Sequence, residues 1–183
     1  IKTRYVAAGQ QLLRADRETV EPLPKQTAKA VASAVAEALS AENSVLVLSD
    51  YGKGVLDDAL IRSLIEIAEK AKAMIFVDPK GRDYSRYKGA GVLTPNRQEL
   101  AQASGMPTDT EDEVTVACRH IIETAGVDAV LATRSEQGMS LITVDHADHL
   151  PARAREVFDV SGAGDTVVAA IATVFGTGAP LSA

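Results

Sequence analysis

Residues 159–166, Asp-Val-Ser-Gly-Ala-Gly-Asp-Thr, combine two glycines with two carboxylates in one short run. An apolar stretch follows at 167–172, which predicts that the glycines form a tight turn at the start of a helix. The unpaired backbone N–H groups and positive dipole end of such a helix bind phosphate oxygens. Phosphate would repel Asp165 unless this carboxylate faced the attacking group, so the run indicates phosphoryl transfer with Asp165 as proton acceptor. A surface turn before a helix with an acidic first turn would give the same spacing.

Four further polar segments follow stretches that we predict to be strands. They are Asp-Tyr-Gly-Lys-Gly at 50–54, Asp-Pro-Lys-Gly at 78–81, Thr-Pro-Asn-Arg-Gln-Glu at 94–99 and Thr-Arg-Ser-Glu-Gln-Gly at 133–138. Ligands of parallel sheets bind at the carboxyl ends of the strands, so these segments are predicted to line one cleft. Each also has a simpler explanation as a turn or strand end. Asn96 fits a helix N-cap with Glu99 in the capping-box position, and Glu99 would still be able to face a metal-bound water.

Strand and helix patterns alternate along most of the chain, which is typical of a mainly parallel sheet with helices on both faces. The expected strands are 45–49, 73–77, 91–94 and 127–133, and the expected helices are 25–39, 56–72, 96–103 and 111–125. Residues 139–144 are predicted to pair as an antiparallel strand. Residues 3–15 differ, because two extended pieces flank Gly9-Gln10 as in a hairpin.

The composition limits the class of protein. The chain has 183 residues, of which 46% are hydrophobic, enough for one sizeable core. A net charge of -6 and the absence of a basic block argue against a nucleic-acid partner. No apolar run reaches membrane-spanning length, and a single cysteine, Cys118, predicted to be buried and reduced, fits a cytoplasmic protein. His120, His146 and His149 lack metal-ligand spacing and are expected to be solvated or structural.

With Asn96-x-x-Glu99, the segment 133–138 and the run 160–166 in this order, the chain resembles the ribokinase-like PfkB carbohydrate kinases. The resemblance implies a three-layer α/β/α sandwich with a mainly parallel sheet, here a partial domain. Within that family, residues 10–16, 49–56 and 78–81 are most similar to the kinase domain of ADP-heptose synthesis. This domain phosphorylates D-glycero-β-D-manno-heptose 7-phosphate at its anomeric hydroxyl.

The resemblance also implies roles for individual residues. Asp165 is the expected catalytic base, and the backbone N–H groups of Gly162, Ala163 and Gly164 form the anion hole for the γ-phosphate of ATP. The expected nucleotide-binding residues are Asn96, Arg97, Gln98, Glu99, Thr133, Arg134 and Gly138. Asn96 and Glu99 are also expected to organise Mg²⁺, mainly through water. Asp50, Lys53 and Lys80 are expected at the sugar-phosphate acceptor.

The chain departs from the family pattern at both ends. The amino-terminal half with the sugar-binding signature and the carboxyl-terminal helices near the adenine have no counterpart, so we expect a fragment of uncertain activity. Residues 1–20 resemble part of a β lid that mediates homodimers in the family. Alternatives are another PfkB-type sugar kinase, a non-catalytic nucleotide-binding remnant, and a dinucleotide-binding oxidoreductase. The last requires a third Gly or Ala at the position of Val167.

Overall fold

The computed structural model describes residues 2–7, 10–40, 44–152 and 162–178. Its strands are β1 (Lys2–Ala7), β2 (Gln10–Asp16), β3 (Val45–Ser49), β4 (Met74–Asp78), β5 (Val92–Leu93), β6 (Ala129–Thr133), β7 (Met139–Thr143) and β8 (Ala147–Leu150). Its α-helices are α1 (Lys25–Ala38), α2 (Asp58–Ala71), α3 (Arg97–Ser104), α4 (Glu111–Ala125) and α5 (Ala163–Gly176). Two 3₁₀ turns, η1 (Ser85–Tyr87) and η2 (Ser135–Gln137), lie in the loops.

The main sheet has the strand order β3-β4-β5-β6-β7-β8. The strands β3 to β6 pair in parallel, and β7 and β8 continue the sheet antiparallel. The four parallel strands therefore end at one edge, where the polar segments predicted to form a cleft begin.

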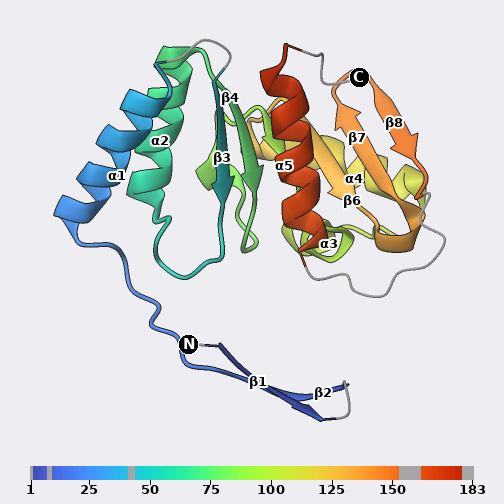
Figure 1. Cartoon of the computed structure of the whole chain (residues 1–183). Coiled ribbons are helices and arrows are strands. Elements are labelled where there is room, and N and C mark those ends of the chain that lie inside the picture. The colour runs from blue at the N-terminus through green and yellow to red at the C-terminus, as the bar shows by residue number, and fades with distance from the viewer. Residues whose placement is uncertain (1, 8–9, 41–43, 153–161, 179–183) are drawn as a thin grey trace.

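The core is divided between the two faces of this sheet, because successive strand side chains point to opposite sides. On one face, Val77 and Leu93 belong to the large apolar cluster formed with α2 and α4. On the other face, Phe76 and Val92 pack with Val168 of α5 in a smaller cluster. Figure 1 shows α5 in front of the sheet and α4 behind it, so the predicted α/β/α layering is confirmed.

Local sequence explains where the helices begin and end. The Asp57 side chain accepts the Leu60 N–H at 2.8 Å and caps α2. Asn96 starts α3 and Thr110 starts α4, each in a capping box with the glutamate three residues later. Gly105 and Gly126 end α3 and α4 in the left-handed conformation typical of helix C-termini.

The predicted elements agree with these bounds to within a few residues, and 45–49 and 111–125 match β3 and α4 at both ends. Strand β8 was not predicted. Its residues include Asp148 and His149, and it forms through antiparallel pairing with β7 rather than through an apolar pattern of its own. The first residues of the run 159–166 lie outside the described part of the chain, whereas α5 begins at Ala163 as predicted.

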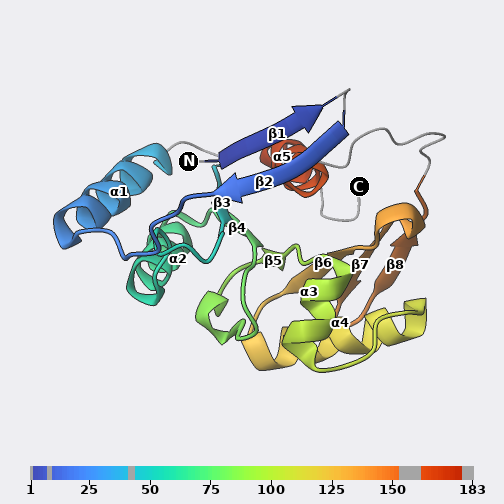
Figure 2. The ribbon, with the colours of Figure 1, turned by 90° about the horizontal axis from the view of Figure 1, so that it is seen from below.

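The hairpin predicted at 3–15 is present as the antiparallel ribbon β1–β2. Figure 1 shows this ribbon apart from the main body, on the side where the parallel strands end, and Figure 2 shows it from below. The segment that joins it to α1 returns to the body, because Glu18 forms an ion pair with Lys53 and the backbone of Glu21 lies against Gly54. In the part of the chain that the structure describes, no helix is both long and apolar enough to cross a bilayer.

Candidate active site

Contacts between neighbouring loops join the predicted strand-end segments. The Asp50 N–H donates to the Asp78 carbonyl at 3.0 Å, which connects the ends of β3 and β4. The Thr133 N–H donates to the Pro95 carbonyl at 3.0 Å, which connects the segments after β5 and β6. The four polar segments therefore lie along one edge of the sheet, in the order of the strands that they follow.

Helix α5 begins directly after Gly162. Gly162 occupies the N-cap position with φ +76°, a conformation that favours glycine, and no side chain of the described residues caps this helix. A Cβ atom built on Gly162 or Gly164 would meet no described atom within 4 Å. Both the N–H and the hydroxyl of Thr166 donate to the Gly162 carbonyl at 2.9 Å, which holds the first turn. An anion can therefore approach the backbone of this turn closely.

Asp165 lies in the first turn of α5 and is exposed. The Tyr51 hydroxyl, in the segment after β3, donates to Asp165 Oδ1 over 3.5 Å. No ion pair involves Asp165 within the described ranges, so its carboxylate remains able to accept a proton from a bound hydroxyl group.

Tyr51 also lines a pocket of about 290 Å³ formed by Ser49, Asp50, Tyr51, Lys53, Val55 and Leu56. Asp50 is 4% exposed, and its Oδ1 accepts the Gly52 N–H at 2.7 Å. The Lys53 ammonium group is paired with Glu18. The pocket thus joins two of the predicted acceptor residues, Asp50 and Lys53, to the neighbourhood of Asp165.

Asn96 and Glu99 form the capping box predicted from the sequence. Glu99 Oε2 accepts the Asn96 N–H at 3.1 Å, and the Asn96 side chain accepts the Glu99 N–H at 2.9 Å. The other carboxylate oxygen of Glu99 lies 2.8 Å from Lys80 Nζ, and this hydrogen bond raises the pKa of Lys80. A predicted nucleotide residue and a predicted acceptor residue are therefore in direct contact.

Asp78 lies among these groups and was not among the predicted site residues. Burial raises its pKa from 3.8 to about 6, with further increases from the charges of Glu99 and Asp165 and a decrease from Lys80. Burial is the main cause of this shift, and the neighbouring carboxylates of Glu99 and Asp165 add to it.

These groups fit a hydrated magnesium ion. Among the described residues, no three His, Cys, Asp or Glu side chains are grouped closely enough to hold a metal ion by themselves. Mg²⁺ commonly keeps several waters and binds through one or two carboxylates together with substrate phosphates. Glu99, with Asn96 beside it, can serve such an ion through its waters.

The segment 133–138 is fixed by its own hydrogen bonds. Arg134 is buried, its guanidinium group donates to Glu111 Oε1 at 3.0 Å, and its N–H donates to the Gly138 carbonyl at 2.7 Å. Gly138 has φ +93°, and a Cβ atom there would lie 2.0 Å from the Leu150 carbonyl oxygen. The Arg134 side chain is therefore held by Glu111, whereas Ser135, Glu136 and Gln137 are exposed. Arg97 is half-buried and Gln98 exposed in the first turn of α3.

A family model for the pfkB family carbohydrate kinases matches residues 3–183. The chain belongs to this family. It is 55% identical over 183 residues to the bifunctional protein HldE of Rhodospirillum rubrum and 51% identical over 181 residues to that of Acidiphilium cryptum. The two alignments include 100% and 99% of this chain but only 37% of each relative. The chain therefore spans little more than a third of the relatives' length.

Solved structures support the same fold. Escherichia coli phosphofructokinase-2 in complex with potassium matches with a TM-score of 0.80 at 21% identity, covering 96% of this chain and 56% of that one. Arabidopsis thaliana ribokinase complexed with ribose and ATP matches with a TM-score of 0.67 at 22% identity, covering 90% and 50%. The resemblance to PfkB kinases inferred from the sequence motifs is confirmed, and the dinucleotide-binding oxidoreductase alternative is wrong.

Two features of this pfkB site were not identified as functional from the sequence. Tyr51 is part of the segment 50–54, but only the fold brings its hydroxyl to Asp165. Asp78 is part of the segment 78–81, but its place opposite Ser49, beside Asp50, is set by the register of the folded sheet.

Proposed function

We propose that this chain is part of an ATP-dependent carbohydrate kinase that phosphorylates D-glycero-β-D-manno-heptose 7-phosphate at its anomeric hydroxyl. The single observation that carries the proposal is the position of Asp165. It is an exposed carboxylate in the first turn of α5, next to a tyrosine that lines a pocket. Another PfkB-type sugar kinase would use the same arrangement, so the acceptor rests on the similarity of residues 10–16, 49–56 and 78–81 to the heptose kinases.

In the proposed reaction, the acceptor hydroxyl lies between the pocket and α5 and loses its proton to Asp165 as it attacks the γ-phosphorus of ATP. The bond from this phosphorus to the ADP oxygen breaks, and ADP leaves. The backbone N–H groups of Gly162, Ala163 and Gly164 stabilise the charge on the transferred phosphoryl oxygens. Because these amides belong to a folded turn, they need little reorganisation when that charge develops.

On the nucleotide side, we propose that Asn96, Arg97, Gln98 and Glu99 lie beside the ATP phosphates, and that Thr133, Arg134 and Gly138 flank the nucleotide. Mg²⁺, held through water at Asn96 and Glu99, would supply charge neutralisation and phosphate orientation. The close contact between Lys80 and Glu99 supports a shared boundary between nucleotide and acceptor.

On the acceptor side, we propose that Lys53 and Lys80 reach the phosphate already present on the sugar, with Asp50 in the pocket wall. Each lysine is paired with a glutamate in this structure, Lys53 with Glu18 and Lys80 with Glu99. A sugar phosphate would compete for these ammonium groups with a doubly charged anion.

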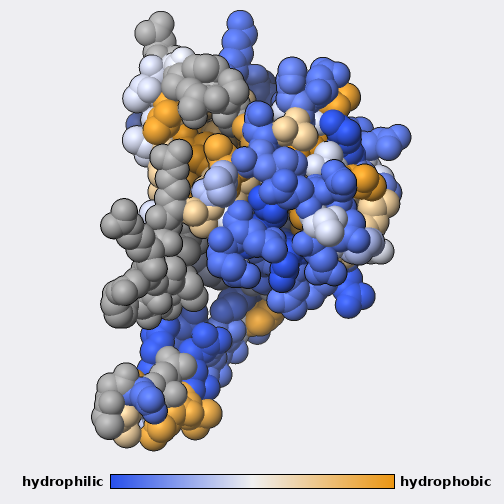
Figure 3. Space-filling view, turned by 90° about the vertical axis from the view of Figure 1, so that its right-hand side faces the viewer, coloured by the Kyte–Doolittle hydropathy of each residue, from blue (hydrophilic) through white to orange (hydrophobic). Residues whose placement is uncertain are grey.

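We further propose that residues 1–20 form a lid that takes part in a homodimer, and that the protein acts in the cytoplasm, where ATP is available. The ribbon β1–β2 supports the first point, because it stands on the cleft side of the body and exposes Tyr5, Leu12 and Leu13. Figure 3 shows hydrophobic side chains on the ribbon below a body whose facing side is mainly hydrophilic.

The proposal is tested with Asp165→Asn in the protein expressed from its complete gene. This change keeps the size of the side chain and removes the proton acceptor, so we expect kcat for heptose 7-phosphate to fall roughly a hundredfold or more while ATP binding persists. Asp112→Asn, which changes an exposed carboxylate in the first turn of α4, is the matched control and should retain normal turnover.

Three results would contradict parts of the proposal. Near-normal turnover of Asp165→Asn would refute the role of the base. ATP binding without turnover of any sugar phosphate by the parent protein would identify a non-catalytic nucleotide-binding remnant. Turnover of a different sugar phosphate with a higher kcat/KM would keep the kinase and replace the acceptor.

A further inference from the structure

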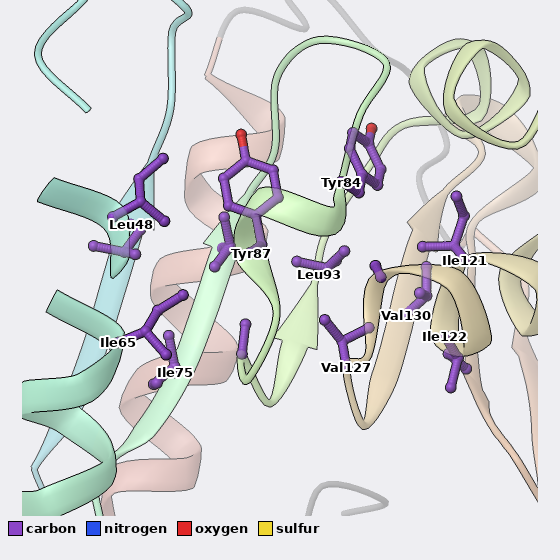
Figure 4. Packing of buried hydrophobic residues seen from close by; sticks show 14 of the residues in the cluster. Leu48, Ile65, Ile75, Tyr84, Tyr87, Leu93, Ile121, Ile122, Val127 and Val130 are labelled. Carbon is purple, nitrogen blue, oxygen red and sulfur yellow. The ribbon is translucent and has the colours of Figure 1, made fainter. Parts of the chain in front are cut away.

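Tyr87, in the 3₁₀ turn η1, lies behind the cleft and belongs to no motif of the family resemblance. Its side chain is fully buried in the large apolar cluster between the sheet, α2 and α4. Figure 4 shows its ring against this cluster beside that of Tyr84, with both hydroxyl groups pointing away from the apolar side chains. A hydroxyl group held at the end of such a rigid ring has a well-defined position.

The Tyr87 hydroxyl connects the loops that follow β3 and β4. It donates to Asp50 Oδ2 at 2.7 Å and accepts the Lys80 N–H at 3.1 Å. The Lys80 carbonyl lies 3.2 Å away, but the charged and nearer carboxylate is the stronger acceptor for the single hydroxyl proton. One buried group thus contacts a residue of each loop.

Asp50, held by the Tyr87 hydroxyl, also fixes the residues that follow it in the loop. Its second carboxylate oxygen accepts the Gly52 N–H at 2.7 Å, so Tyr51 is held between two fixed residues. Gly52 in turn lies against the other loop, because a Cβ atom on it would come within 3.3 Å of Lys80 Cγ.

Arg86 supports the same carboxylate from the neighbouring position of η1. Its Nη1 lies 3.5 Å from Asp50 Oδ2, and its Nη2 donates to the Leu56 carbonyl at 2.9 Å. Its guanidinium carbon is 5.6 Å from the centre of the Tyr87 ring. The buried Asp50 carboxylate is therefore compensated by a cation and two hydrogen bonds, as a buried charge requires.

We propose that Tyr87 is a positioning residue, which fixes the segments 50–53 and 78–81 relative to each other through its hydroxyl group. The first segment holds Tyr51 opposite Asp165 and presents Lys53, and the second presents Lys80. The consequence for catalysis rests on the proposed function, because it assumes that these segments meet the sugar phosphate. The positional claim itself does not depend on that assumption.

The experiment compares Tyr87→Phe with Tyr84→Phe in the protein expressed from its complete gene. Tyr84 is a matched control, because it is also buried, its ring packs edge-on against Tyr87 at 5.9 Å, and its hydroxyl has no hydrogen-bond partner among the described residues. Each variant removes one oxygen atom from the same cluster, but only Tyr87→Phe removes the connection between the loops.

The first measurement is amide hydrogen exchange. The Lys80 amide loses its acceptor in Tyr87→Phe, so we expect its exchange to become about tenfold faster, while Tyr84→Phe keeps the parent rate. The second measurement is steady-state kinetics, in which the KM for the sugar phosphate should rise about tenfold in Tyr87→Phe with the KM for ATP within about twofold. A purely structural role would lower thermal stability without this difference between the two KM values.

The proposal is overturned if Tyr87→Phe and Tyr84→Phe give the same Lys80 exchange rate. If the protein phosphorylates no sugar phosphate, the proposed function fails, but faster Lys80 exchange in Tyr87→Phe alone still upholds the positional role. Should Tyr87→Phe not fold, Asp50→Asn provides the second test, because it removes the charged acceptor that holds the Tyr87 hydroxyl and should speed exchange at the Lys80 amide. An unchanged Lys80 rate in that variant would also overturn the proposal.

Discussion

At the scale of single residues, the edge of the sheet gathers more negative than positive charge. Asp78 experiences the carboxylates of Glu99 and Asp165, while Lys80 is the cation that opposes them most strongly. Partial burial, together with these neighbouring carboxylates, disfavours the ionised form of Asp78. The ionised Asp78 side chain therefore lowers the stability of the folded protein.

The raised pKa of Asp78, about 6 against an ordinary value of 3.8, predicts a pH-dependent stability. Below pH 3.8 the Asp78 carboxyl group is protonated in both the folded and the unfolded state, and its contribution to folding stability is fully present. This stability is lost as the pH rises through about 6, because Asp78 ionises less readily in the folded state than in the unfolded state. We expect Asp78→Asn to be more stable than the parent protein near neutral pH, with the advantage shrinking toward pH 4.

Urea denaturation between about pH 4 and pH 8, without nucleotide or Mg²⁺, measures this effect. The expected gain near neutral pH is on the order of 1 kcal/mol, a value reduced for the partial access of solvent to this group. Asp148→Asn, on the exposed strand β8, should leave the pH dependence unchanged. Equal pH profiles for Asp78→Asn and the parent protein would contradict the prediction.

At the scale of elements, α3 and α4 begin in the same way but serve different purposes. Both carry a complete capping box, at Asn96 and at Thr110. Both helices begin near the carboxyl ends of the parallel strands, because Glu111 in the first turn of α4 pairs with Arg134 after β6. Only the α3 box contains a glutamate that contacts Lys80. The α4 box starts a helix whose buried face packs on β6 and β7.

This difference predicts distinct outcomes for Asn96→Ala and Thr110→Ala. Each variant should lose about 1 kcal/mol of folding stability, because each removes the side-chain acceptor at a helix start. Only Asn96→Ala should also raise the KM for ATP, by roughly fivefold, the equivalent of about 1 kcal/mol. Chemical denaturation and steady-state kinetics of both variants test this. An ATP KM that responds equally to the two changes would assign Asn96 a purely structural role.

The elements also explain how far the sequence could predict the structure. Helix α4 was predicted at both ends because its start and stop signals, Thr110 and Gly126, are local. Strand β8 was missed because its pairing with β7 is a tertiary interaction that its polar residues do not indicate. The same distinction holds for the site. Asp165 and Glu99 follow from motifs, whereas the hydrogen bond of Tyr87 to Asp50 joins residues 37 positions apart and no local pattern indicates it.

At the scale of the whole molecule, the ribbon β1–β2 is the part with the least support from the rest of the chain. Two strands alone are marginally stable in water, and this ribbon leaves Tyr5, Val6, Leu12 and Leu13 more than half exposed. Exposed apolar side chains gathered on one element indicate an interaction surface. In the proposed homodimer, a second copy of the ribbon would bury these side chains.

This arrangement predicts that Leu12→Asp converts a homodimer into a monomer. Leu12 is 69% exposed in the single chain, so a charge there should cost the single chain little and should oppose burial against a partner. Sedimentation velocity over a range of concentrations measures the change in mass. Val116→Asp, which alters an exposed apolar residue of α4 away from the ribbon, should keep the mass of the parent protein. A parent protein that sediments as a monomer at all concentrations, or a dimer that Leu12→Asp leaves intact, would exclude the ribbon as the dimer contact.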